Sequence, residues 1–266
     1  MVKRNTITDI QKKYCSGEKL AVLTAYDHSV ARLVDSAGID MILVGDSLGM
    51  VVQGHNSTIP VELDHIMYHT EIVVRSTEKA FIIADMPFMS YQISHEEAIR
   101  NALTIIKKTG CNAVKIEGAG FNIPIIERLT EVGIPVMGHL GLQPQSVNIL
   151  GGYPVQGREK AEAMKMIEDA RKLEKAGVFS IVLEKVSSDL TAEITSMLNI
   201  PTIGIGSGSD CSGQVLVVND MLGMDEYIKF KFVRKYADLS NVITNAVKEY
   251  ISDVKEMKFP AQGESF

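Results

Sequence analysis

The sequence predicts a (β/α)8 barrel, because short apolar runs lead into an acidic residue at regular intervals. Four such runs lead into Asp46, Asp85, Glu117 and Glu184: Met41–Val44, Phe81–Ala84, Ala113–Ile116 and Ser180–Leu183. Runs of this kind are typical of strands buried in a parallel sheet. The intervals between the acids correspond to about one, one and two strand–helix units of the ~30 residues that each unit of such a barrel uses. The length of 266 residues also suits one barrel of this class.

The four acids are expected to share one rim, since the carboxyl ends of barrel strands meet at the face that carries active sites. Crowded carboxylates raise one another's pKa unless a cation neutralises them. A hard divalent ion with oxygen ligands, most naturally Mg2+, would supply that charge. The alternative for a single acid such as Asp46 is the cap of a following helix, a place where Ser47 would serve equally well.

Eight apolar segments alternate with helical patterns along the chain. The predicted strands are 20–25, 41–44, 81–84, 113–116, 135–139, 180–183, 201–205 and 214–218. No Pro- or Ser-rich linker separates them, which favours a single barrel. A doubly wound open sheet is the alternative.

Local signals predict where the helices begin and end. Ser94 is a typical N-cap, with Glu96 and Glu97 in the first turn, and Gly110 ends the same helix. Other helices are expected to end at Gly38, to begin at Pro60, and to cover 122–132, 158–175, 189–198 and 239–254. The segment 206–213 is too short for a full helix, so the seventh helix is expected to be reduced or missing.

We expect one barrel domain over 1–266, with a short N-terminal arm over 1–19 and a mobile C-terminal tail from Pro260. The connection from Leu140 to Gly157 is long and rich in Gly, Pro and Gln. Connections of that length in a compact domain tend to be functional.

Composition narrows the class of protein. The net charge is −6 and no basic run is present, which argues against a nucleic-acid partner. No apolar run approaches the ~20 residues of a membrane span, and no secretory leader is expected. The three cysteines are dispersed and odd in number, which fits a reducing cytoplasm better than a disulfide scaffold.

Two further residues on the predicted rim, Lys115 and His139, have side chains that could contact a substrate. Lys115 and Glu117 are two apart on one strand, so their side chains leave it on the same face. Lys115 could form a structural ion pair there or hold a substrate carboxylate, and we favour the second reading. His139 ends the fifth strand and is either a core histidine or a substrate contact.

His65 and His69 have a spacing that can bind zinc, but the Glu of the H-E-x-x-H motif is absent, so we assign them a packing role.

Several blocks of the sequence resemble those of the ketopantoate hydroxymethyltransferases (3-methyl-2-oxobutanoate hydroxymethyltransferases). The blocks are Leu23–Asp27, Leu43–Met50, Asp85–Phe88, Val114–Gly118, Gly138–Leu142, Gly151–Tyr153 and Gly213–Val217. The resemblance implies a TIM barrel of the phosphoenolpyruvate/pyruvate type that forms a homo-oligomer, decameric in several members. The implied reaction moves a hydroxymethyl group from 5,10-methylenetetrahydrofolate to 3-methyl-2-oxobutanoate. Its product, 2-dehydropantoate, leads to pantothenate.

The resemblance also implies roles for individual residues. Asp46, Asp85 and Glu117 match the ligands of Mg2+. Ser47 and Lys115, together with Asp46 and Asp85, match the groups that contact the oxo-acid, and His139 is added to them as a candidate contact from its place on the rim. Glu184 matches the proton acceptor. The loop 206–213 departs from the family's usual Gly-Ala-Gly pattern, which leaves the folate contacts unassigned.

These residues suggest a chemistry. The carboxylate and keto oxygens of the oxo-acid would chelate Mg2+, which would act as a Lewis acid and favour the enolate. Glu184 would take the C3 proton. Two rival readings stay open: a carbon–carbon lyase or mutase of the phosphoenolpyruvate type, and a non-catalytic barrel that binds a metabolite.

Overall fold

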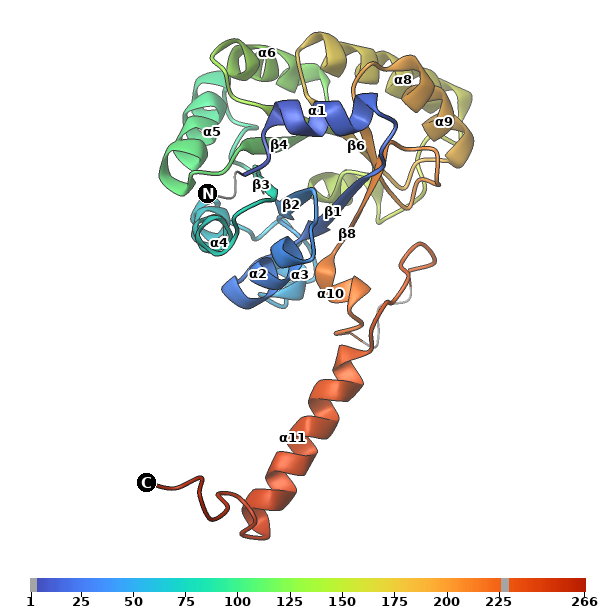
Figure 1. Ribbon diagram of the computed structural model, residues 1–266. Coiled ribbons are helices and arrows are strands. Elements are labelled where there is room, and N and C mark those ends of the chain that lie inside the picture. The colour runs from blue at the N-terminus through green and yellow to red at the C-terminus, as the bar shows by residue number, and fades with distance from the viewer. Residues whose placement is uncertain (1–3, 226–229) are drawn as a thin grey trace. The chain divides into compact units, whose positions relative to one another are not determined.

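The computed structural model describes residues 4–225 and 230–266, and the chain divides into two compact units (Figure 1). The first unit is Met1–Val217 and the second is Val218–Phe266. Each unit is described by itself below. The single domain over 1–266 therefore stays a prediction, as does the mobile tail.

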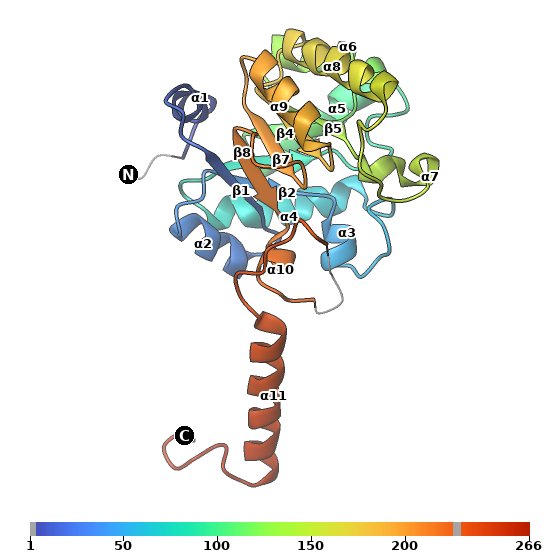
Figure 2. The ribbon, with the colours of Figure 1, turned by 90° about the vertical axis from the view of Figure 1, so that its right-hand side faces the viewer.

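The first unit is a closed parallel barrel of eight strands in sequence order (Figures 1 and 2). Its strands are β1 (Leu20–Thr24), β2 (Met41–Val44), β3 (Phe81–Asp85), β4 (Ala113–Glu117), β5 (Val136–Gly141), β6 (Ser180–Glu184), β7 (Thr202–Ile205) and β8 (Gly213–Leu216). Strand β1 pairs with β2 on one side and with β8 on the other, which closes the sheet. The predicted (β/α)8 barrel is confirmed, and the open-sheet alternative is wrong.

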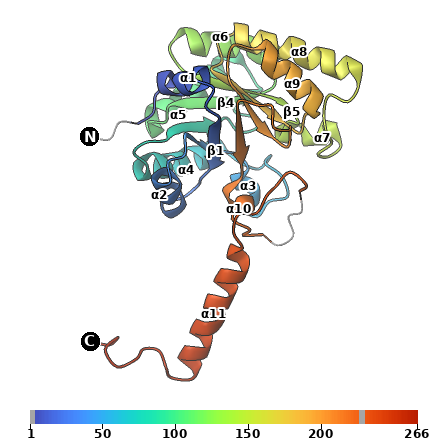
Figure 3. The same cartoon turned by 45° about the vertical axis from the view of Figure 1, so that its right-hand side comes forward.

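Helices surround the strands, as Figure 3 shows for α8 and α9. The α-helices of this unit are α1 (Ile7–Cys15), α2 (His28–Ser36), α3 (Leu48–Val51), α4 (Leu63–Ser76), α5 (His95–Thr109), α6 (Ile123–Glu131), α7 (Val147–Leu150), α8 (Lys160–Lys175) and α9 (Ser188–Met197). Two short 3-10 turns, η1 (Gly120–Asn122) and η2 (Pro144–Ser146), precede α6 and α7. The predicted caps of α5 are confirmed, since Ser94 Oγ accepts from Glu97 N at 3.2 Å and Gly110 is left-handed with φ 73°.

Several boundaries differ from the prediction by one to three residues, and two of these differences have a clear local cause. Helix α4 begins at Leu63 because Pro60 lies in a turn that Val61 N closes on Thr58 O. Strand β8 ends at Leu216 because Val218 begins a helix.

The seventh helix is missing, which is one of the two outcomes that the sequence predicted. Residues 206–212, all of which the structure describes, contain no helix. Ser207 Oγ instead donates to Leu183 O at 2.7 Å and accepts from Val186 N at 3.0 Å, which ties this connection to the end of β6.

The barrel interior is a continuous apolar core toward the amino ends of the strands. Its buried members are Ile10, Leu20, Val22, Met41, Leu43, Phe81, Ile83, Ala113, Met137, Phe179, Val182, Ile203 and Val215. Ile10 belongs to α1, and Ile7 of the same helix packs against the cluster. Helix α1 therefore closes the end of the barrel opposite the carboxyl rim.

The second unit contains α10 (Val218–Met221) and α11 (Leu239–Lys255). The chain folds back on α10 through bonds from Tyr236 N to Met221 O and from Leu239 N to Leu222 O. None of the residues of α11, all described, is buried, and its exposed apolar side chains are Val242, Ile243, Val247, Tyr250, Ile251 and Val254. In the described part of the chain, no helix is both long and apolar enough to cross a membrane.

We predict that Leu20→Ala lowers the free energy of unfolding by about 2–5 kcal/mol, because it opens a cavity in the barrel core. Leu20 is 2% exposed, whereas Leu33 on α2 is 60% exposed. The matched change Leu33→Ala should therefore cost less than about 0.5 kcal/mol. Urea unfolding of both variants tests this, and equal losses would contradict the assignment of Leu20 to the core.

Candidate functional site

Charged side chains form the layer of the barrel interior nearest the carboxyl ends of the strands. Along β3 the inward-facing residues Phe81 and Ile83 are followed by Asp85, and along β4 Ala113 is followed by Lys115 and Glu117. His139 follows Met137 on β5, and Glu184 follows Val182 on β6, with the same spacing of two. Side chains two apart on a strand share a face, so an apolar floor supports one polar layer.

Lys115 lies at the centre of this layer. Its Nζ is 2.6 Å from Asp85 Oδ1, 3.8 Å from Glu117 Oε1 and 3.2 Å from His139 Nδ1. Burial lowers the pKa of Lys115, but the carboxylates of Asp85, Glu117 and Asp46 outweigh that effect and raise it. Lys115 is therefore a buried ammonium. The ion pair with Glu117 that the sequence left as an alternative is present at 3.8 Å, and Asp85 is a nearer partner that the sequence did not indicate.

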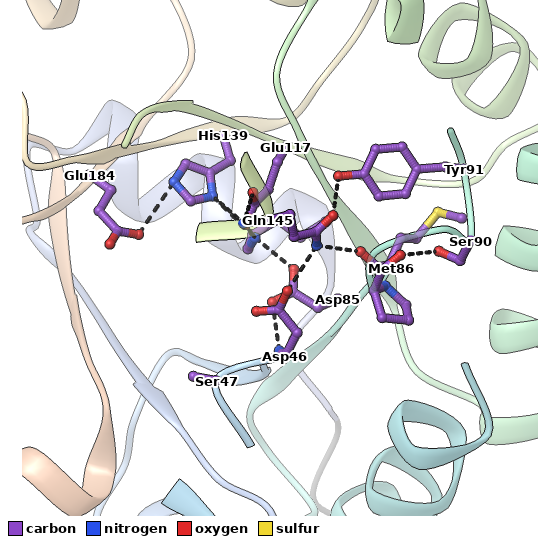
Figure 4. A network of polar contacts seen from close by, with 12 residues as sticks. Asp46, Ser47, Asp85, Met86, Ser90, Tyr91, Glu117, His139, Gln145 and Glu184 are labelled. Carbon is purple, nitrogen blue, oxygen red and sulfur yellow. Dashed lines mark hydrogen bonds and ion pairs between the residues drawn. The ribbon is translucent and has the colours of Figure 1, made fainter. Parts of the chain in front are cut away.

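His139 lies between this ammonium and Glu184. Figure 4 shows the side of the ring that faces Glu184. Burial, with help from the charge of Lys115, lowers the pKa of His139, so the ring is neutral. An ammonium can only donate, so Nδ1 accepts from Lys115 and the ring proton lies on Nε2. That Nε2 faces Glu184 Oε2 at 3.4 Å. Both ring nitrogens of His139 thus face side chains of the protein.

Asp46 comes from the turn after β2 and lies against Asp85. Its backbone N–H donates to Asp85 Oδ2 at 3.0 Å. Burial and the charge of Asp85 raise the pKa of Asp46 to about 7. Burial likewise raises the pKa of Glu117 well above its ordinary value, although Lys115 opposes the shift. The layer therefore holds more carboxylate than its one ammonium can balance.

Ser47 is held by a tyrosine rather than by a helix end. Its Oγ is 2.8 Å from Tyr26 Oη, and His69 Nδ1 lies 2.6 Å from the backbone oxygen of Tyr26. Among the described residues, Ser47 makes no side-chain cap to α3, although it precedes that helix. His65 accepts from Glu62 N at the start of α4, so the two histidines hold separate structural positions as predicted.

Gln145 is a member of the site that the residue pattern did not single out. It lies in η2, in the long connection after β5, and is buried. Its Nε2 donates to Asp46 Oδ2 at 2.8 Å, and its backbone N donates to Glu117 Oε2 at 3.2 Å (Figure 4). The only signal for it was the length of the Leu140–Gly157 connection, which indicated function without indicating which residue.

The chain matches the family model described as ketopantoate hydroxymethyltransferase over residues 4–262. The chain belongs to the ketopantoate hydroxymethyltransferase family. It is 54% identical over 254 residues to the 3-methyl-2-oxobutanoate hydroxymethyltransferase of Chlorobium phaeobacteroides, covering 94% of this chain and 92% of that protein. The protein of the same name from Geotalea daltonii is 52% identical over 267 residues and is covered in full, as is this chain.

Membership of the ketopantoate hydroxymethyltransferase family makes this chain a transferase that acts on small molecules. Neither rival reading, a lyase or a non-catalytic barrel, agrees with that membership. All of the residues predicted as functional lie toward the carboxyl ends of β2 to β6 or in the turns that follow. They are Asp46, Ser47, Asp85, Lys115, Glu117, His139 and Glu184.

Solved structures confirm the barrel type. Phosphonopyruvate hydrolase, in a complex with oxalate and Mg2+, matches with a TM-score of 0.61 at 11% identity, covering 98% of this chain and 93% of that one. 2,3-Dimethylmalate lyase, a member of the PEP mutase/isocitrate lyase superfamily, matches with a TM-score of 0.61 at 15% identity, covering 100% of this chain and 89% of that one. At such identities the likeness concerns the fold alone.

The donor set of this family member fits a hard divalent cation. Asp46, Asp85 and Glu117 bring carboxylate oxygens into a buried layer, which are the ligands that Mg2+ prefers. Burial first, and then the neighbouring carboxylates, raise the pKa values of Asp46 and Glu117, and a bound cation would oppose both effects. As the side chains stand, with Lys115 among them, no group of three or more His, Cys, Asp or Glu in the described residues is spaced to hold a metal.

We predict that Asp46→Asn makes stability less dependent on pH. The folded pKa of Asp46 is about 7, above the ordinary 3.8, so the folded state binds the proton more tightly than the unfolded state. The stability that this proton contributes is complete at acidic pH and is lost as the pH rises through 7. The variant's free energy of unfolding, relative to wild type, should therefore increase by about 2 kcal/mol from pH 5 to pH 8.

Urea unfolding at the two pH values, in the presence of a chelator, measures the effect. Asp210→Asn in the exposed part of the 206–212 connection is the matched control and should show no such change. A difference between Asp46→Asn and wild type that is the same at both pH values would contradict the burial of an ionisable Asp46.

Proposed function

We propose that this chain transfers a hydroxymethyl group from 5,10-methylenetetrahydrofolate to 3-methyl-2-oxobutanoate. The products are 2-dehydropantoate and tetrahydrofolate, and the reaction is a step toward pantothenate. The observation that carries the proposal, beyond family membership, is the placement of Glu184. Its carboxylate lies across His139 from the cluster of Lys115, Asp85 and Glu117, which separates a base from a cation site.

Asp46, Asp85 and Glu117 are the residues that would hold Mg2+ in this site. When bound there, Mg2+ would supply Lewis acidity toward the keto oxygen of the oxo-acid. Phosphonopyruvate hydrolase, which shares this fold, has been solved in a complex with oxalate and Mg2+, and oxalate resembles the oxo-acid in its paired oxygens.

The protein's own side chains would then place the oxo-acid and move its proton. The Lys115 ammonium and the Ser47 hydroxyl are the donors available to the carboxylate of the oxo-acid. The Lys115 ammonium would then be shared between the carboxylate of Asp85 and the carboxylate of the oxo-acid. His139 Nε2 lies 3.4 Å from Glu184 Oε2, which directs that carboxylate toward the barrel interior.

Glu184 accepts the C3 proton, and the electron pair left on C3 forms the new carbon–carbon bond to the one-carbon unit of the donor. The bonds between that carbon and the folate nitrogens break, and the nitrogens take up protons. One water molecule balances the reaction, since its oxygen becomes the hydroxyl of the product.

The remaining parts of the proposal concern the state of the protein. We propose a cytoplasmic enzyme, because Cys15, Cys111 and Cys211 are free thiols. We propose a homo-oligomer, of which a decamer is one form, because α11 presents an apolar stripe with no buried residue. Exposed stripes of this size typically mark contacts between proteins.

We predict that the wild-type protein sediments as a species larger than a dimer. One chain has a mass of 29.2 kDa, so a monomer is easily distinguished at micromolar concentration. Ile243→Asp combined with Ile251→Asp should shift the distribution toward smaller species, because each change places a charge on the apolar stripe of α11. Lys248→Asp, on the same helix but at a polar position, should not. A wild-type protein that sediments near 29 kDa would refute the oligomer.

We predict that Glu184→Gln lowers the turnover and the exchange of the C3 proton of 3-methyl-2-oxobutanoate by roughly 10²-fold or more, the usual range for loss of a general base. The variant keeps the size of the side chain and its contact with His139 but loses basicity. Binding of the oxo-acid and of Mg2+ should be nearly unchanged, as measured by calorimetry.

Deuterium exchange at C3, with and without Mg2+, tests the function itself, together with formation of 2-dehydropantoate that depends on 5,10-methylenetetrahydrofolate. Glu193→Gln on the exposed face of α9 is the matched control. Exchange at the wild-type rate in Glu184→Gln, with reduced turnover, would assign Glu184 to a later step. If the wild-type protein forms no 2-dehydropantoate that depends on 5,10-methylenetetrahydrofolate, the proposed reaction is wrong.

A further inference from the structure

The side-chain amide of Gln145 is saturated with hydrogen bonds. Its Nε2 donates to Asp46 Oδ2 at 2.8 Å and to the backbone oxygen of Met86 at 2.9 Å. Its Oε1 accepts from Tyr91 Oη at 2.6 Å and from Gln92 Nε2 at 3.2 Å. A glutamine amide has two N–H donors and two acceptor lone pairs, so each is used.

These partners allow only one orientation of the Gln145 amide. The Met86 carbonyl can only accept, so the nitrogen must lie on its side. Rotating the amide by half a turn would place Oε1 against two oxygens, those of Met86 and Asp46, and would leave buried groups without partners. A buried group without a partner costs about 1–3 kcal/mol. The donor that meets Asp46 is therefore fixed by the protein alone.

Gln145 also reaches the other acids. Its backbone N donates to Glu117 Oε2 at 3.2 Å, and the Asp46 that it holds donates through its own backbone N to Asp85 Oδ2. One residue of the connection after β5 thus touches two of the three acids, which come from the ends of β2 and β4, and reaches the third through one more bond. Figure 4 shows Gln145 between these acids and Tyr91.

The same connection is attached to the barrel at its far end. Gln156 N donates to Lys185 O at 2.7 Å, and Ser187 N donates to Gln156 O at 3.2 Å, directly beyond Glu184. Gln145 is therefore held by chain on both sides and does not depend on its own contacts alone for its position.

We propose that Gln145 is a positioning residue that sets the affinity of the acid cluster for a divalent cation. The proposal depends on the proposed function only in its assignment of Mg2+ to Asp46, Asp85 and Glu117. By engaging Oδ2 of Asp46 and one oxygen of Glu117, Gln145 fixes the orientation of both carboxylates before an ion arrives. Hydrogen-bonding partners of metal ligands typically contribute 10–100-fold to metal affinity.

Titration of the full-length protein with Mg2+ in a calorimeter tests the proposal. Gln145→Ala and Gln145→Met, which has a side chain of similar length without an amide, should each weaken Mg2+ binding by roughly 10–100-fold, because each removes the donor to Asp46. Gln156→Ala is the matched control in the same connection, because the side chain of Gln156 donates to Pro154 O and forms no hydrogen bond with the acids among the described residues. It should bind Mg2+ as wild type does.

Two further measurements separate positioning from a general loss of structure. With saturating Mg2+, Gln145→Ala should recover most of its kcat, whereas the KM for Mg2+ stays raised. Hydrogen exchange without Mg2+ should be faster at residues 143–147 and at Asp46 in Gln145→Met, with the rest of the barrel unchanged. If Gln145→Ala does not fold, Tyr91→Phe, which frees one side of the amide, should still weaken Mg2+ binding by a few-fold.

Different failures have different meanings. Wild-type protein that binds no Mg2+ would overturn the metal assignment and this inference with it. Wild-type protein that binds Mg2+, with Gln145→Ala within two-fold of it, would overturn the inference alone. Tighter binding by Gln145→Ala would also overturn it, since Gln145 would then compete with the ion for Asp46.

Discussion

The ammonium of Lys115, buried 2.6 Å from Asp85 Oδ1, is the interaction on which the arrangement of the site depends. A buried charge is tolerated only where partners and hydrogen bonds replace the water it has lost. The apolar floor of Ile83, Met137 and Val182 excludes water from below, so each acid of the layer must find a donor within the protein. The result is a polar network in which removing one member leaves its buried partners without a hydrogen bond, which lowers the stability of the fold.

That dependence explains the distribution of partners. Asp85 receives both the Lys115 ammonium and the backbone N–H of Asp46, and Glu117 receives the backbone N–H of Gln145. His139 links the same ammonium to Glu184. Because Lys115 donates to Nδ1, the ring proton lies on Nε2, the nitrogen that faces Glu184. The cation site and the base are thus two ends of one connected set of contacts.

The fold and the acid layer could be predicted because both depend on local pattern. Buried strands that end in acids, and the spacing of two between Lys115 and Glu117, place side chains on a known face at a known rim. The caps at Ser94 and Gly110 are equally local. The contact of Gln145 with Asp46 is not, because the two residues are 99 positions apart and meet only through the path of a long connection. Nor could the sequence decide which partners the ring of His139 would meet, since these come from two neighbouring strands.

Helix α1 covers the amino end of the barrel, with Ile10 in the core and Ile7 packed against it. Apolar side chains fill the interior between α1 and the acid layer, so the barrel is not a channel, and the acids open toward the carboxyl rim. The amino end of the barrel thus serves stability and leaves the chemistry to the opposite face.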